Sequence, residues 1–353
     1  MMNTNTISLK NNVLTPNFGG IKSRQYNVSV KYFDGETFSP SKRIDYHSEI
    51  TIITKGSKLL CSIYKDSFWF NRHEPDLISE LIADELSKTI YPVQVEINDK
   101  AVFQRITNFD YMVNNYWHRN EFRTTEKYTT KVAQSFYDAF ERNLKNRNVF
   151  EKSMQYDLFW NLLFHPKYID YGNKHSVKTD FYLAVVPYEY PIPFTGVQKI
   201  NTAITDYYAV EIYFQSDEME AHPYFIPKDG KTTSGYTFYM QLNVYYDLDV
   251  YYLFPMHTRA YFEVYSKDTE GKKTPVKRIE FTQYQQNTES NKTAPPEERS
   301  PFLVYEEEDG EKEVYMTYEG KNFTYQEWVT FEEEQYKIYK EKQKKKGFWD
   351  FLG

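Results

Sequence analysis

The stretch RQYNVSVKYF, residues 24–33, alternates apolar and polar side chains. A period of two indicates a strand that buries one face, here the face of Tyr26, Val28, Val30 and Tyr32. Two more strand-like runs, IDYHSEITIIT at 44–54 and KLLCSIYK at 58–65, are separated only by Lys-Gly-Ser. A short connection that contains glycine predicts a hairpin. We therefore expect an antiparallel sheet at the start of the fold.

A helical period replaces this alternation in NRHEPDLISELIADELSKTIYP, residues 71–92, where leucine and isoleucine recur every three to four positions. The pattern predicts an amphipathic helix packed on the sheet, with Pro75 near its first position and Pro92 at its end. The next runs, VQVEI and AVFQRI, flank an Asn-Asp-Lys turn at 98–100 and predict a second hairpin.

Three helical patterns follow between residues 109 and 164. The last of them, NVFEKSMQYDLFWNLLF at 148–164, is apolar around most of its circumference, which is typical of a helix in the protein interior. We expect this helix to be central. The middle pattern places apolar side chains four positions apart, on one predicted stripe: Tyr128, Val132, Phe136, Phe140 and Leu144.

Strand-like runs return beyond residue 172. They are FYLAVVPYEY, DYYAVEIYFQ, GYTFYMQLNVYY, DVYYLF, TRAYFEVYS and VKRIEFTQYQ. Short strands separated by turn signals predict an antiparallel sandwich or a barrel-like sheet. The expected fold class is therefore α+β, with an N-terminal antiparallel sheet and packed helices over 1–172, followed by an all-β, sandwich-like domain over 173–286.

The C-terminal part is expected to be a separate small module. Residues 287–301 are polar and contain proline, which predicts a linker. Over 302–353, strand-like runs flank Asp309-Gly310, and the capping-box spacing from Thr324 to Glu327 opens a helical pattern. The sequence predicts a ββα appendage that ends in an apolar tail.

Composition narrows the classes of partner. The 353 residues carry a net charge of −7, which argues against a general affinity for nucleic-acid phosphates. Aromatic residues make up 18% of the chain and include 34 tyrosines, which suit an aromatic-rich β core or a recognition surface. Cys61 is the single cysteine, so no intramolecular disulfide can form, and a reducing compartment is expected.

No motif with an established chemistry is readable. The seven histidines lack the spacing of a zinc site, and the glycines form neither a phosphate-binding loop nor a nucleophile elbow. We expect no catalytic residue, no metal and no cofactor. Asp247 and Asp249 could bind a cation or flank a glycosidic bond, but a turn between strands explains them more simply. Trp117, His118 and Arg119 could line a pocket, although a helix with Arg119 facing water is the simpler interpretation.

The first residues show no basic patch followed by an apolar core, and no run approaches the roughly 20 apolar residues of a membrane span. A cytoplasmic location is expected. Residues 70–120 resemble uncharacterised proteins of Bacteroidota, in which a helix like PDLISELIADELSKTIYP leads into a short strand and an asparagine-containing turn. The resemblance implies a bacterial protein, with toxin–immunity or contractile-secretion loci as a frequent setting, and it brings no functional residue with it.

The tail KKKGFWDFLG, 344–353, carries the candidate partner-binding residues. Burying its apolar side chains yields a gross gain of roughly 6–12 kcal/mol, which the cost of ordering the segment offsets. The tail therefore needs a preformed groove, either on its own chain or on a partner. Glutamates at 332–334 oppose the nearby lysines, so peripheral membrane contact is not favoured. The candidates are Phe348, Trp349, Phe351 and Leu352, together with Trp328 of the predicted helix.

These observations favour a noncatalytic protein-binding protein: an adaptor, a chaperone, a structural accessory or an immunity-type protein, with a secretion or toxin system as its setting. The expected partner is another protein, or a second copy bound through the tail. The alternative is a hydrolase of unrecognised family that acts on glycan or peptide with carboxylates of the β-rich region.

Overall fold

The computed structural model describes residues 6–18, 23–119, 128–227, 236–286, 316–318 and 321–323. The chain divides into two compact units, Met1–Pro296 and Glu297–Gly353. In the second unit, β13 (Met316–Tyr318) pairs antiparallel with β14 (Lys321–Phe323). The predicted linker, the turn at Asp309-Gly310 and the predicted C-terminal helix lie outside the described residues.

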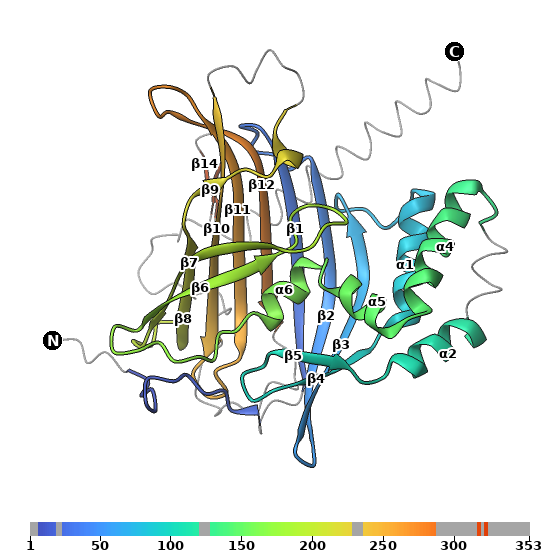
Figure 1. The fold of residues 1–353 in the computed structure, drawn as a ribbon, viewed down its shortest axis with the longest axis horizontal. Helices are drawn as coiled ribbons and strands as arrows, with labels where there is room; N and C mark the ends of the chain where they lie inside the picture. The colour runs from blue at the N-terminus through green and yellow to red at the C-terminus, as the bar shows by residue number, and fades with distance from the viewer. Residues whose placement is uncertain are drawn as a thin grey trace. The chain divides into compact units, whose positions relative to one another are not determined.

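A 12-stranded antiparallel sheet forms the frame of the first unit (Figure 1). Its strands are β1 (Ser23–Asp34), β2 (Lys42–Lys55), β3 (Lys58–Phe70), β4 (Val93–Ile97), β5 (Phe103–Ile106), β6 (Ser176–Leu183), β7 (Ile192–Asn201), β8 (Ala209–Ser216), β9 (Met219–Glu220), β10 (Thr237–Asp249), β11 (Pro255–Lys267) and β12 (Lys273–Gln285). Their order across the sheet is β5-β4-β3-β2-β1-β12-β11-β10-β8-β7-β6, and β9 pairs with β10.

Two meanders meet in the middle of this sheet. The first runs from β1 to β5 and contains the two hairpins expected from the sequence, β2–β3 and β4–β5, which are confirmed. The second runs from β6 to β12 and joins the first where β1 pairs with β12, with Tyr26 opposite Gln285 and Tyr32 opposite Ile279. The sheet thus continues across the boundary predicted at residue 172, while the division of the chain into domains stays a prediction.

The helices are α1 (Ile78–Ile90), α2 (Phe109–Arg119), α4 (Lys131–Leu144), α5 (Arg147–Met154) and α6 (Leu158–Phe164), with a 3-10 turn, η2, at Pro223–Phe225. The single helix predicted over 148–164 was wrong, because the segment forms two helices. The Asp157 carboxylate accepts a hydrogen bond from the Phe159 N–H at 2.9 Å and so caps the start of α6. The predicted stripe on α4 was also wrong in part, since Val132 and Phe136 are exposed and the buried face carries Ala133 and Tyr137.

The short helix α6 is central, as its composition predicts. Its Trp160 ring packs 5.3 Å from the ring of Phe103 in β5, at one end of the sheet. Its Asn161 side-chain oxygen, Oδ1, accepts a 2.8 Å hydrogen bond from the N–H of Ala184, directly after β6 at the other end. Helix α6 therefore bridges the two ends of the strand order (Figure 1).

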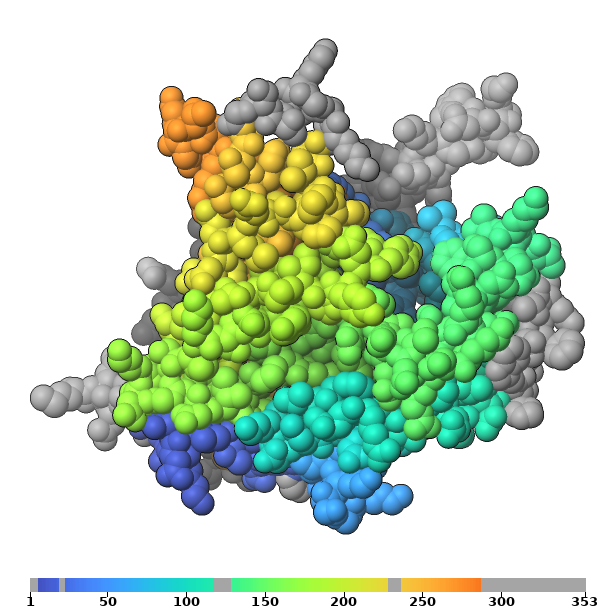
Figure 2. All heavy atoms as spheres, in the orientation of Figure 1, coloured from blue at the N-terminus to red at the C-terminus, as the bar shows by residue number. Residues whose placement is uncertain are grey.

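The sheet curls so that its second meander packs on itself. The ring centroids of Phe194 in β7 and Phe262 in β11 are 5.8 Å apart, although these strands are three positions apart in the strand order. Strands β6 and β7 cross in front of β10 to β12 in Figure 1. In Figure 2 the green and yellow-green segments hide much of this side of the sheet from view.

Two features of the second meander differ from the prediction. Strand β7 was missed, because Pro193 and Gly196 interrupt its apolar pattern. The run DVYYLF was expected to be a strand, but Asp249 ends β10 and the following residues form a turn before β11. The β-rich character of the region is confirmed, with these changes in which segments supply the strands.

Candidate functional site

The sequence-predicted partner-binding residues lie outside the described part of the chain. They are Phe348, Trp349, Phe351, Leu352 and Trp328. The role of the tail therefore stays a prediction. The backbone of residues 117–119 belongs to α2, and the side chains of these residues lie outside the description as well.

The side of the sheet that faces away from the core carries a different candidate. Along β10, Leu242, Val244 and Tyr246 are fully buried, whereas Asn243 and Tyr245 between them are only half-buried. Successive side chains of a strand point to opposite faces. The odd-numbered residues of β10 from 239 to 247 therefore point outward, away from the core that contains α6.

On this surface the strand register aligns Tyr213 of β8, Tyr245 of β10 and Arg259 of β11 in one row. The rings of Tyr213 and Tyr245 stack with centroids 4.6 Å apart and planes inclined by 24°. The Arg259 guanidinium lies 5.1 Å from the centre of the Tyr245 ring, within the range of a cation–π contact. Tyr261 meets Tyr245 edge-on at 6.2 Å.

We call this surface the tyrosine–arginine face. It consists of Tyr213, Asn243, Tyr245, Asp247, His257, Arg259 and Tyr261.

Hydrogen bonds and ion pairs hold the face in one arrangement. The Tyr213 hydroxyl donates to the Asn243 side-chain oxygen at 3.0 Å. One carboxylate oxygen of Asp247 lies 3.2 Å from His257 Nδ1 and 3.5 Å from the Arg259 guanidinium. Desolvation, followed by the neighbouring Tyr245, raises the pKa of Tyr213 to about 12, so its hydroxyl stays protonated at physiological pH. The side chains are thus ordered before any partner arrives.

The stacking also decides what the face presents to a ligand. Because the Tyr213 and Tyr245 rings pack against each other, and Arg259 approaches the ring of Tyr245, their planes are largely engaged within the face. Ring edges, hydroxyl oxygens and the guanidinium N–H groups other than the buried Nε–H remain for contacts. This geometry suits a polar protein surface better than the flat stacking of a sugar ring or a base.

The two aspartates considered from the sequence have separate roles. Asp249 accepts hydrogen bonds from the N–H groups of Tyr251 at 3.0 Å and Tyr252 at 2.6 Å, which confirms the turn interpretation for this residue. It also forms a buried ion pair with Arg24 at 2.8 Å. Asp247 lies within β10, bound to the face, so the turn interpretation was wrong for Asp247.

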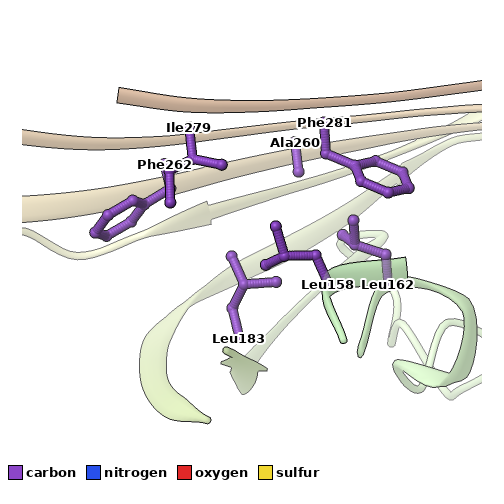
Figure 3. Close-up of a pocket in the computed structure, with 7 residues that line it drawn as sticks. All are labelled: Leu158, Leu162, Leu183, Ala260, Phe262, Ile279 and Phe281. Atoms are coloured by element: carbon purple, nitrogen blue, oxygen red, sulfur yellow. The ribbon is translucent and has the colours of Figure 1, made fainter. Parts of the chain in front are cut away.

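The described structure contains two hollows, and the first is not built for a small ligand. Figure 3 shows the first, an apolar gap where leucines of α6 and β6 point toward β11 and β12. Its volume of about 10 Å³ is about that of one water probe, and its lining offers no polar partner, so we expect it to be dry. The second is an open groove of about 350 Å³, lined by Phe109, Asp110, Val113, Asn114, Leu144 and Lys145.

Within the described ranges, no group of three or more His, Cys, Asp or Glu side chains is placed to hold a metal ion. Over the same ranges no helix has the length and apolar character needed to cross a bilayer. No protein-family model matches the chain, and no curated protein is significantly similar to it.

Sequence reasoning did not single out Tyr213, Tyr245, Arg259 or Tyr261. Each occupies the polar side of a strand-like run, where tyrosine is an ordinary residue. Only the register of strands β8, β10 and β11 brings these residues together. That register depends on the geometry of the hairpins and of the β-bulges. One such irregularity lies between Asp247 and Leu248.

Proposed function

We propose that this chain is a noncatalytic protein-binding protein that recognises a partner through the tyrosine–arginine face. The observation that carries the proposal is the pre-ordered row of Tyr213, Tyr245 and Arg259 on the outward side of the sheet. Tyrosine and arginine are enriched at protein interfaces and supply much of the binding energy there. Side chains that are already ordered lose little conformational entropy on binding.

The roles consistent with this proposal are those of an adaptor, a chaperone, a structural accessory or an immunity-type protein of a bacterial cytoplasm, with a secretion or toxin system as the setting. We also infer that the packing of Phe194 on Phe262 supplies the sandwich-like arrangement expected for residues 173–286. The C-terminal tail is proposed as a second contact, to a partner or to a second copy of the chain.

Site-specific photo-crosslinking tests the proposed face. A photoreactive phenylalanine derivative replaces Tyr213 in one variant and Tyr111, an exposed tyrosine of α2, in a matched control. We expect a discrete adduct from position 213 in the source cell, and its loss when Tyr245→Ser and Arg259→Ser are added to the same chain. Circular dichroism verifies that each variant is folded. Equal adducts from both positions, or an adduct that survives the two substitutions, contradict the proposal.

Truncation after Lys346 tests the tail separately. If the truncated chain no longer forms the cross-linked adduct and its melting temperature is unchanged, the tail takes part in recognition. If the melting temperature falls, the tail stabilises its own chain. The hydrolase alternative requires turnover of a glycan or peptide substrate that is lost in Asp247→Asn. Turnover that depends on this residue would replace the binding proposal.

A further inference from the structure

A buried lysine lies at the end of α6 without a described acidic partner. Lys167 is 1% exposed, and its Nζ donates to the carbonyl oxygens of Leu163 at 2.7 Å and His165 at 3.1 Å. The rings of Tyr246 and Tyr168 lie 5.1 and 5.6 Å from Nζ. These neutral groups can accept hydrogen bonds from the Lys167 amine, but they carry no negative charge that would neutralise an ammonium group.

The other titratable groups around this amine carry no compensating negative charge. His165 is buried, stacks on Phe181 at 3.8 Å and bonds Gln198 at 2.7 Å, so it stays neutral. Tyr171 donates its hydroxyl hydrogen to the Lys167 carbonyl oxygen at 2.7 Å. Asp249 acts on the neighbouring Tyr168, but its charge is paired with that of Arg24. Burial consequently lowers the pKa of Lys167 to about 7 from its ordinary 10.5.

A short N-terminal segment contacts the loop that contains this lysine. We call residues 6–18 the N-terminal strap and residues 165–171 the lysine loop. The strap touches the loop through two backbone hydrogen bonds, from Leu14 N–H to the Ile169 carbonyl at 3.3 Å and from Tyr171 N–H to the Asn12 carbonyl at 3.0 Å. Phe18 adds an edge-on contact with Tyr168 at 6.3 Å.

The strap has few other attachments. Ile7 N–H bonds the Thr202 carbonyl, and Asn17 N–H bonds the Tyr252 carbonyl, both at 2.9 Å. Leu14 is its one fully buried side chain among the described residues 6–18. Ile7, Leu9 and Phe18 pack against the core only partly buried. A segment held by isolated bridges and one fully buried side chain opens more readily than a strand in a ladder.

We propose that the N-terminal strap and the lysine loop form a latch that opens as Lys167 takes up a proton. In the closed latch the ammonium would be desolvated without a counter-ion, whereas in the open latch water solvates it. A proton therefore binds the open state more strongly, and falling pH shifts the equilibrium toward it. With the closed and ordinary pKa values given above, protonation of Lys167 alone raises the opening constant about tenfold from pH 8 to pH 6.

Hydrogen–deuterium exchange of the full-length chain measures this opening. Protection factors, corrected for the intrinsic effect of pH, are compared for peptides covering the strap and the lysine loop and for peptides of β10. We expect the strap and loop to exchange through a local opening that costs less free energy than the opening that exposes β10. Their protection should be at least about tenfold lower at pH 6 than at pH 8. In Lys167→Met, which keeps the length of the side chain, the pH dependence should fall to no more than the roughly fourfold effect that solvation of His165 can add, because burial lowers the pKa of His165 from 6.5 to about 3.

Two results overturn the latch. One is protection of the strap and loop equal to that of β10 at both pH values, which leaves only global unfolding. The other is an unchanged pH dependence in Lys167→Met. If that variant does not fold, Leu14→Ala replaces it, because this variant weakens the anchor and should raise exchange at both pH values while keeping the tenfold ratio. Unaltered exchange of the loop in Leu14→Ala also contradicts the proposal.

Discussion

The buried pair of Arg24 and Asp249 makes an asymmetric prediction about stability. Asp249→Asn leaves a guanidinium that cannot lose its charge, with a 2.9 Å bond to Gln285 and the rings of Tyr252 and Phe254 as its remaining neighbours. Removing one partner of a buried pair costs about 3–5 kcal/mol. We expect Asp249→Asn to lower the free energy of unfolding by that amount, a large share of the roughly 5–15 kcal/mol of an ordinary protein.

The opposite change should cost less. In Arg24→Met the Asp249 carboxylate keeps its backbone donors, which include the N–H groups of Tyr251 and Tyr252. Backbone hydrogen bonds reduce the free-energy cost of burying a carboxylate, so we expect the free energy of unfolding to fall by about 2–3 kcal/mol. The double variant should lose less than the sum of the two single losses, by about 1–3 kcal/mol, because neither charge is then left unpaired.

Urea unfolding at pH 7, followed by circular dichroism, measures these differences through the midpoint at an unchanged m-value. Asp110→Asn is the matched control, because Asp110 pairs with Arg147 at 3.2 Å but its side chain is 83% exposed. Its expected cost is below about 1 kcal/mol. The reasoning is refuted if Asp249→Asn costs no more than this control, or if the two single losses simply add.

Three further predictions concern individual sites. Gly196→Ala would place a Cβ atom 2.2 Å from the Gln215 carbonyl oxygen, so β7 and β8 must separate, and we expect a loss of about 1–3 kcal/mol or more in thermal unfolding. Burial raises the pKa of the Cys61 thiol to about 12, so native protein at pH 8 should resist a thiol reagent, and labelling should follow the unfolded fraction as urea is added. Burial, with a smaller effect from Lys167, lowers the pKa of His165 from 6.5 to about 3. The neutral ring therefore contributes its full stability above pH 6.5, and this stability is lost as the pH falls toward 3. The corresponding slope of unfolding free energy, about 1.4 kcal/mol per pH unit between pH 6 and 4, should be absent in His165→Asn.

Strands with regular alternation could be predicted from the sequence, and interrupted elements could not. The runs that became β1 and β10 carry apolar residues at every second position, as does β2 apart from Ser48, and this pattern survives in the structure. Strand β7 buries Phe194 and Ile200 on the same principle, but Pro193 and Gly196 mask the period. The break between α5 and α6 depends on one capping aspartate within an otherwise helical pattern, and a period of 3.6 does not reveal such a break.

The candidate site was less predictable than the fold because it depends on long-range register. That Tyr245 would stand between Tyr213 and Arg259 follows from two strand pairings. Local sequence determines which face of a strand is polar, but it does not determine which residue of the next strand lies opposite. The exposure of Val132 and Phe136 has the same origin, since the packing of α4 depends on its neighbours as well as on its own apolar stripe.

The pairing of β1 with β12 bears on the order in which the chain is completed during synthesis. Each meander is built from neighbouring strands and can form as soon as its own residues leave the ribosome, but Tyr26 must wait for Gln285, near the end of the first unit. Until then the free edges of β1 and β12 can accept each other from separate molecules, so this seam is where domain-swapped dimers are expected to arise. A nascent chain that stops before β12 would keep the β1 edge open, which makes this edge the natural point for a chaperone to cover.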